Sequence, residues 1–110
     1  MIRQPWRIGE RGSGLLLHPT CLPGPHGCGD HGRESHRFAE QLAAAGQRCW
    51  QMLPISPTPA SGTPYDSPSV FAGSELLISL EGLHEDGWLR RSELEPPGWL
   101  PQDRFDPAAT

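Results

Sequence analysis

Short apolar runs alternate with long stretches of glycine, proline and small polar residues along this chain. The runs at 15–18 and 48–55 each reach a proline, and a short apolar run bounded in this way is consistent with a strand buried on both faces. Between them, residues 34–45 carry apolar side chains at helical spacing and are followed by Gly46, a common helix stop. Residues 14–55 therefore predict strand, loop, helix and second strand, with the two strands adjacent and parallel.

The second half of the chain begins with a long loop. Residues 56–74 are rich in Ser, Pro, Gly and Thr, and loops of this length inside compact domains are usually functional. The chain becomes apolar again at 75–80. The segment 83–94 then predicts a short helix with acidic and arginine residues on its outer side.

Length and composition bound the domain organisation. The chain has 110 residues, 13 of them Gly and 13 Pro, whereas a complete (β/α)₈ barrel typically takes about 250 residues. We expect a polar lead-in at 1–13, an ordered α/β unit at 14–94 and an irregular proline-rich tail at 95–110. Either the chain folds as something small, or it is a piece of something larger.

Charge and cysteine content argue against several classes of function. The formal net charge is −4 and all nine basic residues are arginine, without the basic stripe that nucleic-acid binding needs. No run approaches the ~20 apolar residues of a membrane span, and the start of the chain lacks the apolar core of a signal peptide. Three cysteines without a disulfide-scaffold pattern suit a reducing compartment. We expect a cytoplasmic protein without nucleic-acid or membrane partners.

A series of short motifs, in a fixed order and spacing, runs from about residue 14 to residue 83. They are Gly14–Thr20, Leu22–Pro25, Gly29–Asp30, Ala45–Arg48, Trp50–Pro54, Pro57–Thr58, Pro64–Tyr65, Ser67–Ser69, Phe71–Gly73 and Leu76–Leu80. Together they resemble the amino-terminal part of the 4-α-glucanotransferases (amylomaltases, disproportionating enzymes). Each fragment alone is weak, and the specificity lies in their combination.

The resemblance implies the first β/α units of a (β/α)₈ barrel, incomplete in this chain. It implies transfer of α-1,4-glucan segments between maltodextrins, with retained configuration, through a covalent glycosyl-enzyme. The family's catalytic carboxylates come from later strands, so we expect no catalytic residue here; Asp30 and Asp66 match no catalytic position. No cofactor or metal is implied. The expected partners are a maltodextrin substrate and the missing remainder of the barrel.

Tyr65 matches the family's tyrosine in the loop after the second strand. The resemblance implies that its ring covers the apolar face of a sugar, while Thr63, Asp66 and Ser67 are placed to hydrogen-bond sugar hydroxyls. The alternative is a tyrosine that anchors a turn through a hydrogen bond to its own loop. Two departures from the family pattern, Asp66 for Gln and Ser74 for Asn, leave the finer sugar contacts open.

Other residues suggest chemistry of their own. Four potential zinc ligands lie within a short stretch, but their spacing fits no common zinc pattern: Cys21, His26, Cys28 and His31. His18 ends the first strand, where it either reaches substrate or, as we favour, hydrogen-bonds the neighbouring loop backbone. Trp50 is expected in the core rather than as a sugar platform.

Three hypotheses follow. The leading one is an amino-terminal fragment of a 4-α-glucanotransferase, inactive alone and at best marginally stable. The second is a non-catalytic glucan-binding remnant, or a subunit that needs a separately encoded remainder. The third is a small Cys/His metal-binding module.

Overall fold

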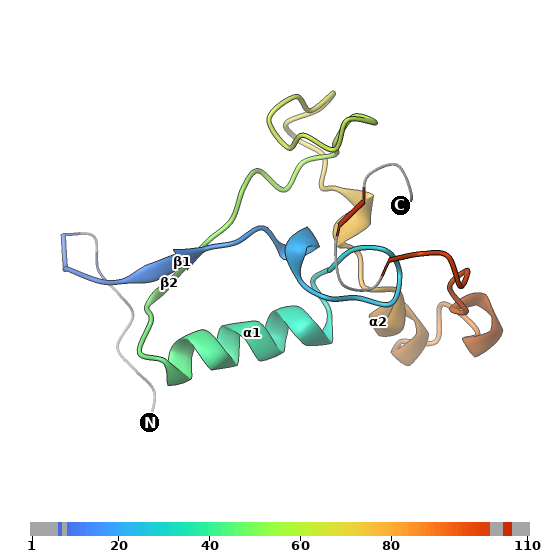
Figure 1. Cartoon of the computed structure of the whole chain (residues 1–110), viewed down its shortest axis with the longest axis horizontal. Coiled ribbons are helices and arrows are strands. Elements are labelled where there is room, and N and C mark those ends of the chain that lie inside the picture. The colour runs from blue at the N-terminus through green and yellow to red at the C-terminus, as the bar shows by residue number, and fades with distance from the viewer. Residues whose placement is uncertain (1–6, 8, 102–104, 107–110) are drawn as a thin grey trace.

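The computed structural model describes residues 7, 9–101 and 105–106. Its regular elements are short and widely spaced along the chain (Figure 1). They are, in order, β1 (Gly14–Leu16), η1 (Pro19–Cys21), α1 (Arg33–Ala44), β2 (Cys49–Gln51), η2 (Glu75–Leu77), α2 (Leu80–Glu85) and η3 (Arg91–Glu93), where η marks a 3-10 turn. None of the helices in this described part is long and apolar enough to cross a membrane.

β1 and β2 pair in parallel, with α1 in the connection between them, so the predicted strand–loop–helix–strand order is confirmed. Leu15 lies opposite Trp50, and Leu16 opposite Gln51. The Leu17 amide donates to the Gln51 carbonyl at 3.0 Å, which extends the ladder beyond β1. A parallel pair needs such a crossover because its strands run in the same direction.

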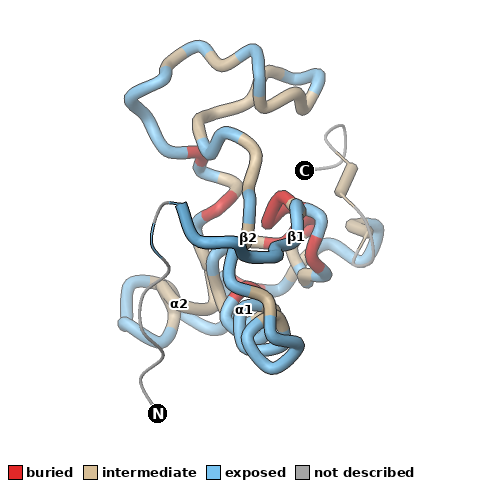
Figure 2. Tube along the Cα trace, turned by 90° about the vertical axis from the view of Figure 1, so that its left-hand side faces the viewer, coloured by how far each residue is buried: buried red, intermediate tan, exposed pale blue. Residues whose placement is uncertain are grey.

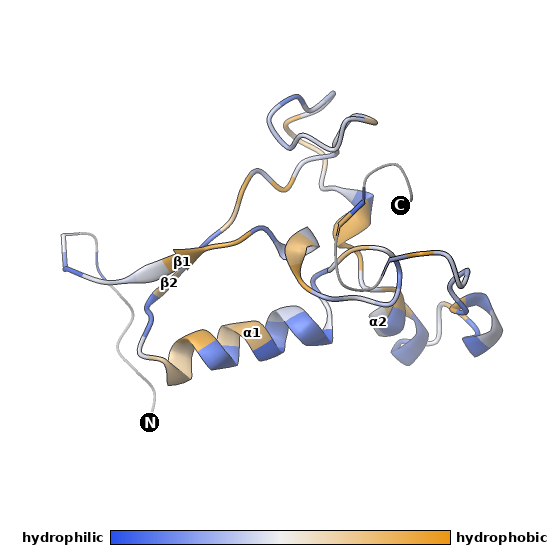
Figure 3. Ribbon diagram, in the orientation of Figure 1, coloured by the Kyte–Doolittle hydropathy of each residue, from blue (hydrophilic) through white to orange (hydrophobic). Residues whose placement is uncertain are grey.

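The strands are shorter and more exposed than predicted. They occupy 14–16 and 49–51, so both end before the prolines that close the apolar runs. The prediction that both faces of these strands are buried is wrong, because Leu15 is 46% and Leu16 56% exposed. The sheet has only two strands, and nothing in the described part of the chain covers Leu16. The run is nonetheless apolar, as Figure 3 shows.

Helix α1 lies close to its predicted bounds. Its apolar side turns toward the strands and its polar side away from them (Figure 3). The Phe38 ring meets the Trp50 ring edge-on, with 4.9 Å between the ring centroids. After the helix, the Gly46 amide donates to the Ala43 carbonyl and the Gln47 amide to the Leu42 carbonyl. These bonds satisfy carbonyls that the end of a helix leaves unpaired.

The predicted helix over 83–94 is wrong in its bounds. The structure has α2 at 80–85 and a separate turn, η3, at 91–93. Ser79 starts α2 early, because its hydroxyl accepts a hydrogen bond from the Gly82 amide at 3.1 Å. Gly87 ends it, since its φ of 81° turns the chain out of the helix. After this turn, the Trp88 amide donates a hydrogen bond to the Leu83 carbonyl at 2.8 Å.

The buried part of the molecule lies in the loops beyond the strands rather than in the sheet. We call residues 18–32 together with 74–79 the loop hub. Pro19 is fully buried there, and Leu22, Cys28 and Leu77 are 8%, 7% and 5% exposed. Figure 2 shows the strands and most of α1 exposed, with buried segments gathered elsewhere.

Backbone hydrogen bonds join the two segments of the loop hub and its own turns. The His31 amide donates to the Leu77 carbonyl at 3.0 Å, and the Gly29 amide to the Thr20 carbonyl at 3.1 Å. The Cys28 thiol points to the Leu76 carbonyl, 3.7 Å away. These bonds let an irregular segment be buried without leaving its polar groups unpaired.

Candidate functional site

The loop that carries Tyr65 extends from the end of β2 and stands away from α1 (Figure 1). Its base is closed by a hydrogen bond from the Ser74 amide to the Ile55 carbonyl, 2.8 Å long. Farther out, the Ser67 hydroxyl donates to the Ser69 carbonyl at 2.9 Å. The loop is therefore shaped by its own short polar contacts, as Ser-rich turns are.

Tyr65 projects from this loop and is 72% exposed. Its amide donates to the Thr63 hydroxyl at 3.4 Å, which brings those two residues together. Asp66 is exposed beside them, and Ser67 is half-buried. Within the described residues the Tyr65 hydroxyl makes no hydrogen bond, so the loop is not held by that group. The ring and its hydroxyl are accessible to a ligand.

Two further apolar side chains on the same loop were not among the predicted site residues. Val70 is 77% and Phe71 99% exposed. Two consecutive apolar side chains exposed to this extent are available for contact with a ligand or a partner. The signal was present in the sequence, because Phe71 interrupts a Ser/Pro/Gly-rich segment without any apolar periodicity around it.

His18 lies buried at the junction of the first strand run and the loop hub, 9% exposed. Its Nδ1 has no hydrogen-bond partner among the described residues, so the predicted bond to the loop backbone is not made by that nitrogen. Burial lowers the pKa of His18, and the neighbouring His31 lowers it further. Both effects favour the neutral imidazole over its charged form.

The potential zinc ligands do not assemble. Within the described ranges, no three side chains of His, Cys, Asp or Glu lie close enough together to hold a metal ion. Cys21 is exposed and Cys28 is buried. Burial raises the pKa of Cys28 to about 11, with Asp30 adding to the effect, whereas a zinc ligand must be a thiolate.

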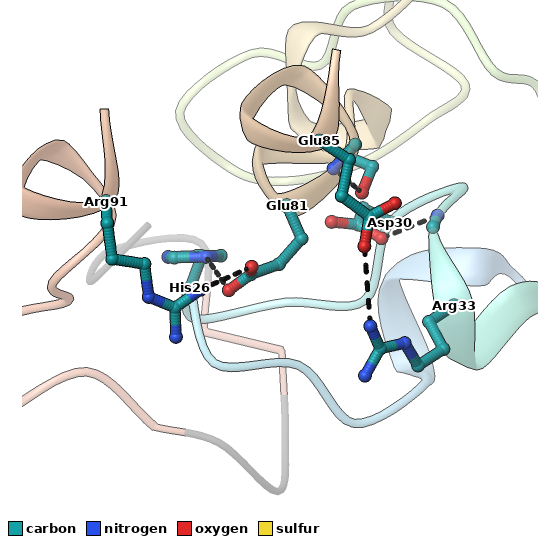
Figure 4. Close-up of polar contacts among 9 residues, drawn as sticks. His26, Asp30, Arg33, Glu81, Glu85 and Arg91 are labelled. Atoms are coloured by element: carbon teal, nitrogen blue, oxygen red, sulfur yellow. Dashed lines mark hydrogen bonds and ion pairs between the residues drawn. The ribbon is translucent and has the colours of Figure 1, made fainter. Parts of the chain in front are cut away.

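A groove of about 780 Å³ runs between the loop hub, the start of α1 and α2, away from the Tyr65 loop. Charged side chains on its walls pair with each other (Figure 4): Arg91 with Glu81 at 3.0 Å and Arg33 with Glu85 at 3.4 Å. His26 approaches Glu81 at 3.9 Å. The two arginine–glutamate pairs lie at the surface and have small individual energies.

Asp30 also has a structural role in this region. Its carboxylate accepts a hydrogen bond from the Gly32 amide at 2.7 Å, and its carbonyl accepts one from the Ser35 hydroxyl. Both contacts fix the start of α1.

Trp50 is half-buried, and its indole N–H donates to the Leu17 carbonyl at 2.7 Å. This environment suits a tryptophan that packs inside the fold better than one that stacks on a sugar.

Comparison with known proteins decides the family. The sequence model described as 4-α-glucanotransferase matches residues 17–109. This chain belongs to the 4-α-glucanotransferase family. The match includes the loop hub and the Tyr65 loop.

Relatives and a solved structure agree with this assignment. The chain is 52% identical over 96 residues to the 4-α-glucanotransferase of Thermus thermophilus, covering 87% of this chain and 18% of that one. It is 45% identical over 101 residues to the chloroplastic/amyloplastic enzyme of Solanum tuberosum, covering 88% of this chain and 17% of that one. An amylomaltase from Streptococcus agalactiae in complex with acarbose superimposes with a TM-score of 0.77 and 35% identity, over 89% of this chain and 19% of that one.

The chain thus spans less than a fifth of the length of these 4-α-glucanotransferases.

Proposed function

We propose that residues 14–94 supply the first β/α units and one substrate-binding loop of a (β/α)₈ barrel that transfers α-1,4-glucan segments between maltodextrins. The family match over residues 17–109 carries the proposal. The parallel pair of β1 and β2 supports it, because that pairing is the repeating step of such a barrel. The likeness to an amylomaltase at 35% identity adds to this support.

The reaction we propose is a retaining double displacement. One carboxylate attacks the sugar and forms a glycosyl-enzyme, while a second protonates the leaving oxygen and then activates the acceptor hydroxyl; the two lie about 5–5.5 Å apart. This chain contributes neither group in our proposal. Asp30 is engaged with the backbone at the start of α1, and Asp66 is exposed on a loop. We expect residues 1–110 alone to be inactive.

Tyr65 is the residue of this chain that we assign to substrate. In a parallel barrel the loops after the strands carry the site, and Tyr65 stands on the loop that follows β2 with its ring exposed. The ring covers the C–H face of one glucose unit. Its neighbours in the loop, Thr63, Asp66 and Ser67, offer the acceptors and donors that sugar hydroxyls need.

We also propose a cytoplasmic location. It is supported by three cysteines, Cys21, Cys28 and Cys49, that are all unpaired, as is usual in a reducing compartment.

The test is a chimaera in which residues 14–94 replace the matched segment of the Thermus thermophilus relative, assayed for disproportionation of maltotriose. We expect Tyr65→Ala to lower kcat/KM roughly tenfold or more, since about 1.4 kcal/mol of lost stacking corresponds to that factor. Tyr65→Phe should retain most of the activity because it keeps the ring. The melting temperature should not change in either variant.

Ser61→Ala is the matched control, because Ser61 is exposed on the same loop and we assign it no contact. An inactive chimaera that is folded would refute the proposed function. Unchanged turnover in Tyr65→Ala, or a collapsed melting temperature, would show that Tyr65 does not bind sugar.

A further inference from the structure

A tryptophan stands exposed on the turn that follows α2. Trp88 is 79% exposed, although tryptophan carries a large apolar area that proteins bury for the most part. Helix α2 lies at the end of the molecule away from β1 and β2, and apart from the Tyr65 loop (Figure 1). Neither the sheet nor the Tyr65 loop therefore accounts for this exposed ring.

Hydrogen bonds hold the turn under the ring in one conformation. Gly87 has a φ of 81° and turns the chain at the end of α2. The amides of Trp88 and Leu89 both donate to the Leu83 carbonyl, at 2.8 and 3.3 Å. The His84 imidazole donates from Nδ1 to the Leu89 carbonyl at 2.9 Å. The backbone that carries the tryptophan is thus ordered in advance, so a ligand need not order it on binding.

The exposed residues nearest to Trp88 along the chain are polar or lack a side chain. They are Glu85, Asp86, Gly87 and Arg90. A surface for a protein partner has an apolar centre built from several residues and enclosed by a rim. A single ring with polar groups beside it suits a sugar instead, because the C–H face of the sugar stacks on the ring and its hydroxyls need hydrogen-bond partners.

Asp86 offers such a partner. Its amide donates to the Gly82 carbonyl at 2.9 Å, which fixes its backbone two residues before Trp88. Within the described part of the chain its carboxylate makes neither a hydrogen bond nor an ion pair, whereas the neighbouring Glu85 pairs with Arg33. A free carboxylate can accept from two sugar hydroxyls. Its charge would be costly to bury without a partner, so this surface suits solvent and a polar ligand better than a covering polypeptide.

We propose that Trp88 and Asp86 form a second glucan-binding site, separate from the Tyr65 loop. The indole stacks on the face of one glucose unit of a maltodextrin, and the Asp86 carboxylate accepts hydrogen bonds from its hydroxyls. The choice of ligand rests on the proposed function, because an enzyme that transfers α-1,4-glucan segments meets long chains of the same sugar. A site outside the reaction centre raises the local concentration of such a chain.

The test is a titration of residues 1–110 with maltoheptaose, followed by the NMR signals of the tryptophan indole N–H groups. The Trp88 signal, assigned by its absence in Trp88→Ala, should shift saturably with a Kd on the order of 1 mM, because one ring and one carboxylate bind weakly. Asp86→Ala should raise this Kd roughly fivefold or more. The Trp50 signal should not move, since its N–H is bonded to the Leu17 carbonyl.

Trp99→Ala is the matched control. Trp99 is 68% exposed, but its neighbours along the chain offer no polar side chain; they are Pro97, Gly98, Leu100 and Pro101. The Trp88 signal should shift in Trp99→Ala as it does in the parent chain, and the same holds for Tyr65→Ala if the two sites are separate. A Kd raised as much in Trp99→Ala or in Tyr65→Ala as in Asp86→Ala would overturn the assignment.

The chimaera gives a second readout that does not depend on the stability of the chain alone. In gels that contain soluble starch, its Trp88→Ala variant should migrate faster than the parent chimaera, because it is retained less by the glucan. An active chimaera that migrates alike with and without Trp88→Ala would overturn this inference and leave the proposed function standing.

The remaining outcomes separate the two proposals further. A folded but inactive chimaera whose Trp88 still binds maltoheptaose would refute the proposed function and leave this site standing. A Trp88 signal that does not move up to about 20 mM maltoheptaose, well above the expected Kd, would overturn the inference. A Trp88 signal that shifts with protein concentration and not with maltoheptaose would show that a second copy covers the ring, and would overturn it too.

Discussion

Two parts of this molecule reverse the usual relation between regularity and burial: the sheet side, which consists of β1, β2 and α1, and the loop hub. β1, β2 and α1 are regular yet exposed, with Leu16 at 56%, whereas the hub is irregular and holds Leu77 at 5%. The difference arises from the neighbours that each part has. The hub is covered by a second segment of this same chain, whereas the described residues leave Leu16 of β1 more than half exposed.

The two parts also obtain their order in different ways. The sheet side depends on hydrogen bonds between strands and on the contact of Phe38 with Trp50, so it gains stability when more strands are added. The hub depends on close approach of backbones. A Cβ at Gly29 would overlap the Pro19 carbonyl oxygen and lie 2.7 Å from the Leu22 carbonyl oxygen, so only glycine fits there.

The largest expected effect is therefore that of Gly29→Ala. The added methyl group must push apart two backbone segments, at about 3 kcal/mol or more, because backbone atoms cannot move aside as a side chain can. We expect the hub to open. Labelling of Cys28, as the single thiol after Cys21→Ser and Cys49→Ser, measures this, since Cys28 is protected only by the hub.

Gly73→Ala is the matched control, because a Cβ at Gly73 meets nothing within 4 Å. It should leave the labelling rate of Cys28 unchanged. A Gly29→Ala protein with Cys28 as protected as in the parent chain would show that the hub is not a close-packed unit, and the contrast with the sheet side would fail.

A smaller effect is expected from truncating a leucine in each part. Leu77→Ala removes buried methyl groups from the hub and should destabilise it by about 2 kcal/mol, at the low end for such changes because loop neighbours can relax. Leu16→Ala should cost less than about 0.5 kcal/mol in the chain alone, since its side chain is largely in water.

The comparison becomes sharper in the covalent chimaera. In our proposed function the remaining barrel strands cover Leu16 there, so Leu16→Ala should become as costly as Leu77→Ala when urea unfolding is measured. A Leu16→Ala variant that stays neutral in the chimaera would mean that Leu16 remains in water in the complete enzyme.

The sequence predicts the sheet side better than the hub, and the reason is physical. Periodicity identifies α1 because Phe38 and Leu42 repeat with the helical period, and proline-bounded apolar runs locate the strands. The same argument fails over 83–94, where the Ser79 cap and the turn at Gly87 override the helical pattern. Burial of the strands is predicted wrongly because the described sheet has two strands, which leave Leu15 and Leu16 about half exposed.

The periodicity of apolar residues predicts neither the burial of the hub nor the candidate site. A segment such as 19–32, with its prolines and glycines, predicts a surface loop, and its burial follows from contacts with residues more than forty positions away, such as Leu76. Tyr65 emerges only from the family resemblance. Val70 and Phe71 were missed, although Phe71 interrupts a Ser/Pro/Gly-rich segment that has no apolar periodicity.

The smallest expected effect concerns His18 and is confined to acid pH. Burial, and then His31, lower the pKa of His18 below its ordinary value of 6.5. The unfolded chain therefore takes up this proton at a higher pH than the folded chain, and stability falls as the pH drops from about 6.5 toward the lowered value. Urea unfolding followed by tryptophan fluorescence, at pH values from about 7.5 to 5, should show this loss.

The loss of stability at acid pH arises from His18 in the hub if it disappears in His18→Gln, because glutamine cannot take up the proton. His36→Gln is the control, because His36 lies exposed on α1 and its removal leaves the hub untouched. Carboxylates titrate in all three proteins alike, so the difference between parent and His18→Gln isolates one imidazole. If the parent and His18→Gln lose stability in parallel over this pH range, His18 is protonated as easily in the folded chain as in the unfolded one. The burial of His18 in the loop hub then does not disfavour its charged form.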